Sequence, residues 1–304
     1  MLWNVVGKKI YYFAFSGIIL IPGIIALGVW GLNLGVDFTG GTLLELAFEK
    51  QIDKNALPTA IREKGIEVAS VTPTAANTYI IRTKPLDDSS RNSILDTTEK
   101  KFGKVTQISV ETIGHTIGAE LLQKAILSVL IASAAIVLYI AWAFRKVPKP
   151  ASSWRFGICA VISLLHDVFV VVGVFSIFGH FFGVQIDTLF VTALLTIIGF
   201  TVHDTIVVFD RIRENLSKGV GDNFASTVNH SIMQTLDRSI ITSLTVVLVL
   251  LAVLLFGGSS IRWFTVALLI GVVSGTYSSI FNASPLLVLW QEWSDKRSKK
   301  IPGN

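Results

Sequence analysis

Residues 194–210 have the sequence LLTIIGFTVHDTIVVFD, in which His203 and Asp204 interrupt an otherwise apolar and hydroxyl-bearing run. A helix of roughly 20 apolar residues crosses the hydrocarbon core of a membrane, and the stretch 186–209 has that length and character. Ionisable side chains inside a bilayer are costly, so each one is a functional candidate. This stretch therefore predicts a membrane-spanning helix that carries a functional carboxylate.

Five further stretches have the same apolar length. Of the 304 residues, 51% are hydrophobic and 15% are charged. A disordered chain is excluded, because it would have low hydrophobicity and high net charge. The charged fraction is also below the roughly 25% that is typical of a soluble domain. Strands of a β-barrel alternate, and these stretches do not. We therefore expect an α-helical polytopic membrane protein with six spans, at 10–30, 121–144, 156–178, 186–209, 239–257 and 263–290.

The first stretch follows Lys8 and Lys9, as the apolar core of a cleaved signal peptide would. Its run from Ile10 to Trp30 is longer than such a core, and no A-x-A-like cleavage site follows it. We expect this stretch to be retained as an anchor helix.

Basic residues in the short loops predict the orientation, because loops rich in Lys and Arg stay on the cytoplasmic side. They gather before the first span, between spans two and three, between spans four and five, and after the sixth. The two short loops on the other side contribute only Arg262. The expected segments are a cytoplasmic N-terminus at 1–9, a first span at 10–30, an outer domain at 31–120, five spans within 121–290, and a basic cytoplasmic tail at 291–304. The net charge of +5 thus marks the inner membrane face and not a nucleic-acid partner.

The outer domain holds most of the acidic residues and no apolar run long enough to span. Its alternating and helical spacings predict the order βαββαβ of the ferredoxin-like motif, inserted between spans one and two. The expected elements are strands at 42–48, 67–72, 78–83 and 105–113, helices at 53–63 and 88–102, and a polar turn at 75–77. Asp37, Gly40 and Gly41 precede the first strand, where a glycine pair permits a sharp backbone turn. This turn is either a structural elbow or a direct substrate contact.

Thr201, Asp204 and Thr205 share one helical face at spacings i, i+3 and i+4. Arg238, at the expected start of span five, is a candidate counter-charge for Asp204 if the two helices pack; the alternative is a basic residue at the membrane edge. Making and breaking this pair is a two-state element that a proton gradient could drive. His203 could tune the site or relay the proton. A static polar anchor is the alternative for Asp204.

His166 and Asp167 lie near the middle of span three. They form either a helix-to-helix hydrogen-bonding pair or a second station on a proton path. A metal phosphohydrolase would need further His and Asp ligands in a soluble helical domain, which the sequence lacks. Small residues in span six would let another helix approach and suggest an assembly: Gly271, Ser274, Gly275, Ser278 and Ser279.

The sequence contains no P-loop, no H-E-x-x-H motif and one cysteine, Cys159. We therefore expect neither an enzyme nor a bound cofactor or metal.

Four stretches resemble the SecF branch of the SecD/SecF family of bacterial protein export, part of the RND superfamily. They are VDFTGGT at 36–42, GFTVHDTIVVFDRIREN at 199–215, TLDRS at 235–239 with the TSLT that follows, and GVVSGTYSSIFNASP at 271–285. The resemblance implies a subunit of the Sec translocase in the bacterial inner membrane, in which the proton-motive force promotes late steps of polypeptide export. It assigns proton conduction to Asp204 and Arg238. His203 departs from the pattern, because many relatives have asparagine there.

The resemblance also implies that the chain is half of a twelve-helix, pseudo-symmetric unit completed by SecD. That unit would lie beside the SecYEG channel, with YajC and YidC, and would contact lipids, protons and the translocating polypeptide. Two other functions stay open: an RND-type exporter of small molecules or lipids, and a passive scaffold for partner helices.

Overall fold

The computed structural model describes residues 4–53, 56–75, 77–145, 148 and 152–299. Several residues of the predicted elements lie outside these ranges: Lys146, Lys149 and Lys300 of the basic segments, residues 54–55 of the helix at 53–63, and Ala76 of the turn. The chain forms two compact units. We call them the helical unit, which comprises residues up to 33, 128–184 and from 189 onward, and the sheet unit, which comprises residues 34–127 and 185–188.

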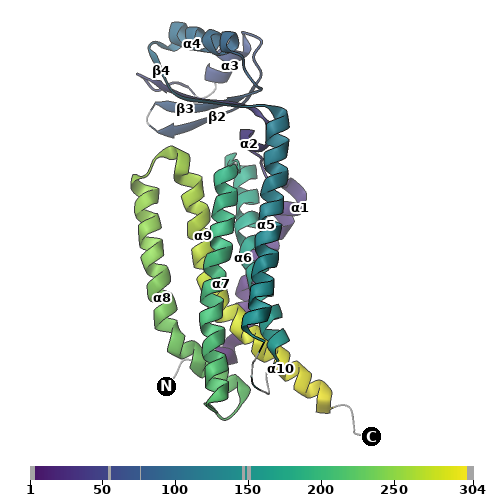
Figure 1. The fold of residues 1–304 in the computed structure, drawn as a ribbon. Coiled ribbons are helices and arrows are strands. Elements are labelled where there is room, and N and C mark those ends of the chain that lie inside the picture. Colours follow the sequence, from purple (N-terminus) through teal and green to yellow (C-terminus); the bar gives the residue numbers. More distant parts are fainter. Residues whose placement is uncertain (1–3, 54–55, 76, 146–147, 149–151, 300–304) are drawn as a thin grey trace. The chain divides into compact units, whose positions relative to one another are not determined.

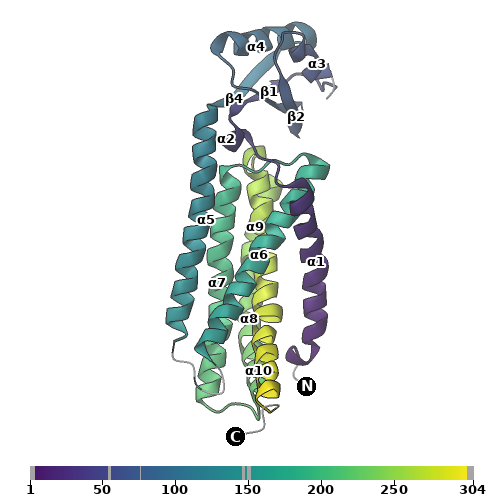
Figure 2. The same ribbon diagram turned by 90° about the vertical axis from the view of Figure 1, so that its right-hand side faces the viewer.

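Six helices of the described chain are long and apolar enough to cross a membrane, which confirms the predicted number of spans (Figures 1 and 2). They are α1 (Lys9–Trp30), α5 (His115–Ala143), α6 (Ser153–Phe182), α7 (Thr188–Ser217), α8 (Phe224–Phe256), and the continuous run of α9 (Arg262–Ser278), a π-helical turn (Ser279–Ala283) and α10 (Ser284–Lys299). A 3-10 turn (Val6–Lys8) precedes α1. Polar residues extend most helices beyond their apolar runs. As a result α8 begins at Phe224, and Arg238 lies inside this helix instead of at its start.

Close packing holds the helical unit together. A cluster of aromatic rings from Phe144, Phe156 and Phe209 has centroids 5.0–5.8 Å apart. Gly23 of α1 and Gly173 of α6 lie so close that a Cβ on Gly173 would be 2.6 Å from the Cα of Gly23. Small residues let transmembrane helices approach this closely, and dispersion then stabilises the contact.

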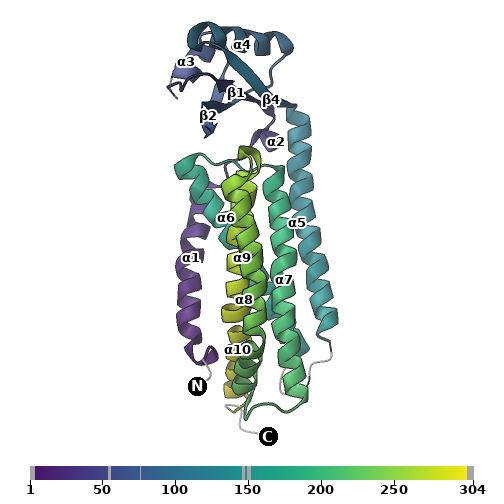
Figure 3. The same cartoon turned by 90° about the vertical axis from the view of Figure 1, so that its left-hand side faces the viewer.

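The sheet unit has the predicted order βαββαβ; Figure 3 labels its strands β1, β2 and β4 and its helices α3 and α4. The sheet is antiparallel with the strand order β2-β3-β1-β4. Its elements are β1 (Gly41–Phe48), α3 (Ala56–Arg62), β2 (Val68–Ala75), β3 (Thr78–Thr83), α4 (Asp88–Phe102) and β4 (Val105–Ile113). In the register, Leu44 pairs with Ile81 and with Val110. Leu44 and Ile81 are completely buried with Leu57 and Ile94, so the two helices close one face of the sheet.

The boundaries of α4 and β4 coincide with their predicted ranges because local signals mark them. Asp87 caps α4: its carboxylate accepts hydrogen bonds from the Ser90 backbone N–H (3.0 Å) and the Ser89 hydroxyl (2.8 Å). These hydrogen bonds, first from Ser90 and then from Ser89, lower the pKa of Asp87 to about 2. Gly103 ends the helix with a positive φ of 88°.

Candidate functional site

The hydroxyl-flanked face of α7 points into the helical unit. Thr201, Asp204 and Thr205 are all buried, with Asp204 only 4% exposed. The Thr205 hydroxyl donates to the backbone carbonyl of Thr201 (3.1 Å). In α7 and α8, three buried side-chain oxygens have no hydrogen-bond partner among the described residues: Thr201 Oγ1, Asp204 Oδ2 and Ser239 Oγ. A buried carboxylate oxygen without a donor is costly, and a bound proton both neutralises it and supplies a donor. The chemistry of this site therefore permits a change of protonation at Asp204.

His203 and Arg238 lie differently from Asp204. Both are exposed on the surface of this chain, so they do not share its buried environment. Their charges lie within electrostatic reach of Asp204, but no ion pair joins either of them to Asp204 in the described part of the chain. The structure therefore brings together Thr201, Asp204 and Thr205, and leaves Arg238 as a nearby counter-charge.

Helix α9 packs directly against the Asp204 face. A Cβ on Gly275 would overlap the hydroxyl of Thr201, and one on Gly271 would overlap Ile197 of α7. On a neighbouring face of α9, Ser274 bonds to α6 and not to a partner chain. The small residues of span six are therefore used inside this chain, so they do not by themselves support the predicted assembly.

His166 and Asp167 of α6 form a second buried site in which every carboxylate oxygen has a partner. Asp167 Oδ1 accepts from Ser274 (2.8 Å) and lies 3.0 Å from His166 Nδ1, and Oδ2 accepts from Ser278 (2.7 Å). Asp167 is completely buried. Two α9 hydroxyls thus hold the α6 carboxylate in place. This geometry favours the helix-to-helix anchor among the two predictions for this pair.

The π-helical turn extends this anchor to α1. Asn282, within the turn, donates to the hydroxyl of Ser16 (2.7 Å), and its amide nitrogen lies 3.5 Å from His166 Nε2. No sequence pattern predicts a role for Ser16 or Asn282. A polar side chain within an apolar stretch was the available signal, but the π-turn that aims Asn282 at α1 depends on tertiary packing.

The predicted elbow is a compact turn of the sheet unit. Residues Val36–Thr39 form the short helix α2, and Gly40 and Gly41 follow with φ of 73° and 146°. A Cβ on Gly40 would lie 2.7 Å from the Cα of His115, and one on Gly41 would lie 2.6 Å from the carbonyl oxygen of Thr83. Only glycine fits both the backbone conformation and this space. Of the two interpretations of the glycine pair, this geometry supports the structural elbow.

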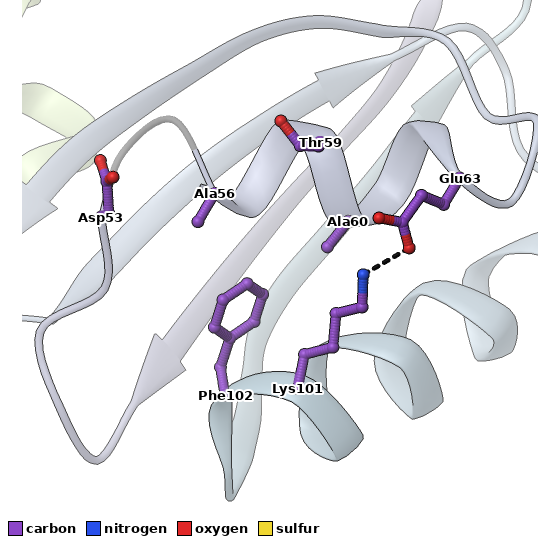
Figure 4. Close-up of a pocket in the computed structure, with 7 residues that line it drawn as sticks. All are labelled: Asp53, Ala56, Thr59, Ala60, Glu63, Lys101 and Phe102. Carbon is purple, nitrogen blue, oxygen red and sulfur yellow. Dashed lines mark hydrogen bonds and ion pairs between the residues drawn. The ribbon is translucent and has the colours of Figure 1, made fainter.

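No group of three or more His, Cys, Asp and Glu side chains that could hold a metal ion occurs in the described residues. The sheet unit has an open hollow of about 510 Å³ between α3 and α4 (Figure 4). An ion pair between Glu63 and Lys101 crosses it, and Phe102 forms part of its wall. These side chains do not form a set of nucleophile and base.

Comparisons with known proteins agree with the motifs. Residues 93–293 match the family model of the C-terminal part of the protein export membrane proteins SecD and SecF, and residues 25–52 match the SecD/SecF GG motif. The chain is 46% identical to a protein translocase subunit SecF of Thermobaculum terrenum, over 95% of this chain and 94% of that protein. It is 45% identical to a subunit SecF of Anaerolinea thermophila, over 98% of both chains.

A solved structure has the same fold. The translocon-associated membrane protein SecDF of Thermus thermophilus superposes with a TM-score of 0.85 at 34% identity, over 96% of this chain and 39% of that one. The chain thus corresponds to 39% of a longer protein whose name, SecDF, combines SecD and SecF.

Proposed function

Because the chain belongs to the SecD/SecF family of protein export membrane proteins, we propose that it is a protein translocase subunit driven by the proton-motive force. In this role it promotes late steps of polypeptide export across the cytoplasmic membrane. Relatives that bear the subunit name match the chain over nearly their whole length, which supports a translocase subunit over an exporter of small molecules or lipids.

The observation that carries the proton coupling is the buried, unpartnered oxygen of Asp204 on α7. One elementary charge that crosses 100 mV releases about 2.3 kcal/mol, which is enough to change the populations of two conformations substantially. Asp204 takes up and releases the proton. Thr201 and Thr205 line its face of the helix.

Arg238 and His203 act on Asp204 from outside its buried face. In the ionised state, Arg238 supplies the compensating charge by approaching Asp204. In the protonated state this attraction is lost, and α7 and α8 are released to move relative to each other. His203 lies next to Asp204 on the exposed side, where it can tune the site or relay the proton.

His166 and Asp167 have a static role in this proposal. Because both oxygens of Asp167 already accept hydrogen bonds from α9, taking up a proton there would break an existing contact. The pair holds α6 to α9 as a frame against which α7 moves.

SecD is the expected partner, because relatives named SecDF combine the two names in one chain. The matched region is 39% of the solved SecDF chain, which leaves the rest of that chain for the SecD part. Helices α1 and α8 leave most of their apolar side chains exposed, so lipid or partner helices can cover them. A twelve-helix unit with SecD uses part of this surface. The SecYEG channel, YajC, YidC and the translocating polypeptide complete the proposed assembly.

We place the chain in the bacterial inner membrane with both termini in the cytoplasm and the sheet unit on the outer side. Arg145 stacks over Trp142 (4.9 Å to the ring centroid), and Arg297 lies over Trp293 (5.5 Å). Tryptophan with arginine is typical of the cytoplasmic membrane interface. No catalysis and no cofactor form part of this proposal.

The test is the variant Asp204→Asn, which retains the size of the side chain and removes its titration. We expect export of a secreted precursor to lose its dependence on the proton gradient, while the protein level and its association with SecD stay unchanged. Asp210→Asn is the matched control, because Asp210 is exposed on the same helix and pairs with Arg213 (2.6 Å). If export in Asp204→Asn still depended on the proton gradient, proton coupling through Asp204 would be contradicted. A passive scaffold would instead tolerate replacement of Asp204 and Arg238 together.

A further inference from the structure

Asp37 of the elbow is bonded to the first residue of α7. Its Oδ2 accepts hydrogen bonds from the backbone N–H of Thr188 (2.9 Å) and from the Thr188 hydroxyl (2.7 Å). The N–H groups of the first turn of a helix have no partner inside the helix, and the helix dipole makes this end positive. A carboxylate from a position 151 residues away therefore supplies both the acceptor and the negative charge that this end lacks.

A half-buried arginine of the sheet lies in the same electrostatic neighbourhood. Arg82 of β3 pairs in register with Leu43 of β1 and donates to the hydroxyl of Thr72 (3.3 Å). Burial lowers the pKa of Arg82, and the negative charges of Asp187 and Asp37 oppose this effect. Asp37 is thus attracted both to the start of α7 and to the sheet.

The backbone around Asp37 is held as closely as its side chain. The Gly35 N–H donates to the carbonyl of Ile186 (2.8 Å), two residues before α7 begins. On the other side of Asp37, Gly40 is packed against the first turn of α5 and Gly41 against Thr83, and β1 begins at Gly41. These contacts therefore hold the backbone of the elbow closely between β1 and the segment that leads into α7.

We propose that Asp37 is a positioning residue that couples α7 to the sheet unit, so that a movement of α7 is passed to β1 through the Asp37–Thr188 contact. This inference rests on the proposed function, because α7 is the helix that carries Asp204. Thr188 and Asp204 are 16 residues apart on α7, which is about 24 Å along a helix axis at 1.5 Å per residue. A helix is stiff over that length, so a change at Asp204 displaces its first turn.

The first test separates proton movement from export. Asp37→Ala removes both hydrogen bonds of the contact, and Thr188→Val removes only the one that the hydroxyl donates. We expect Asp37→Ala to reduce precursor export at least about fivefold, in line with the loss of a helix cap, and Thr188→Val to reduce it less, because the backbone N–H still bonds to Asp37. Asp204-dependent proton release from acid-loaded everted membrane vesicles should continue in both variants. Asp88→Asn is the control, since Asp88 is an exposed carboxylate of the same unit. Equal loss of proton release and export in Asp37→Ala would mean that the residue maintains the proton site, and unchanged export would mean that the contact transmits nothing.

The second test restores the contact covalently in the same molecule. The single cysteine, Cys159, is replaced by alanine, and Asp37 and Thr188 are replaced together by cysteine (D37C with T188C). We expect the reduced pair to export poorly and a short thiol cross-linker to restore export. Cross-linking that leaves export low would overturn a rigid coupling at this point. If Asp204→Asn instead keeps gradient-dependent export, the proposed function fails on its own, whatever the cross-link does.

Discussion

The two buried aspartates of the helical unit differ in their hydrogen bonds, and the roles that we propose for them rest on this difference. Asp167 accepts from two serine hydroxyls of α9, whereas Asp204 Oδ2 accepts from none of the described residues. A fully bonded carboxylate stabilises one arrangement of helices. A carboxylate with an unbonded oxygen loses no hydrogen bond there when it takes up a proton, so the change between its two protonation states costs less free energy than in a fully bonded carboxylate. Sequence spacing makes the two residues look alike, and only their surroundings distinguish them.

The prediction at this scale concerns Asp167. Asp167→Ala leaves the hydroxyls of Ser274 and Ser278 without their acceptor in an apolar interior, so we expect it to destabilise the helical unit by about 1–3 kcal/mol. Thermal unfolding of the purified protein in detergent measures this as a lower Tm. Asp204→Asn is the comparison and should leave the Tm unchanged or raise it. Equal Tm values for the Asp167→Ala variant and the unaltered chain would contradict the anchor.

At the scale of the element, the helices of this chain meet through glycine. Gly173 contacts the backbone of α1, and Gly271 and Gly275 face side chains of α7. Backbone cannot move aside as a side chain can, so the α1–α6 crossing is the less tolerant contact. The contact of α9 with α7 is made mainly with side chains, which can adjust, and the movement that we propose for α7 needs such a contact.

We therefore predict that Gly173→Ala costs about 1–3 kcal/mol through overpacking. Its Cβ would lie 2.6 Å from Gly23 Cα and 2.9 Å from Gly23 C. Gly157→Ala in the same helix is the matched control, because a Cβ there has no atom within 4 Å and alanine favours the helix. Unfolding temperatures of the two variants should move in opposite directions. Equal unfolding temperatures of the Gly173→Ala and Gly157→Ala variants would show that the α1–α6 contact has room for a Cβ at position 173.

For the molecule as a whole, exposed apolar surface is concentrated on particular helices. Large side chains of α8 such as Leu248, Leu255 and Phe256 lie on the surface, whereas α6 and α7 bury about half of their apolar length. Lipid chains can cover such a surface as well as protein can. Relatives named SecDF imply SecD as a protein partner of this chain.

We predict that the chain co-purifies with SecD in a stoichiometric complex and that α8 supplies part of the contact. Large polar replacements at the exposed positions Leu248 and Val249 should weaken co-purification, since a polar group at a dry helix interface lacks a partner. Replacement of Ile108, exposed on β4, is the comparison and should have no effect through α8. Undiminished recovery of SecD with the α8 variants would place the contact on other helices.

The sequence by itself determined the elements of this protein, because their signals are local. Apolar length alone predicts six spans, alternation predicts the four strands, and caps such as Gly103 end the helices where expected. It also identified Asp204, since a charged group in an apolar run needs no neighbour to be noticed. The predicted ends of the helices were less accurate. The fifth span was expected at 239–257, but α8 begins at Phe224 because its polar first turns continue the helix beyond the apolar run.

Only the tertiary structure decided which partner each polar group contacts. The bonding of Asp167 to Ser278, 111 residues away, and of Asp37 to Thr188, 151 residues away, depends on helices and strands that meet after folding. The same holds for the exposure of Arg238 and the unbonded oxygen of Asp204. Hydropathy records the solvent that a segment prefers, whereas hydrogen bonds depend on distances of about 3 Å between atoms far apart in the chain. For that reason the number of membrane-spanning helices was predictable, and the different hydrogen bonding of the two aspartates was not.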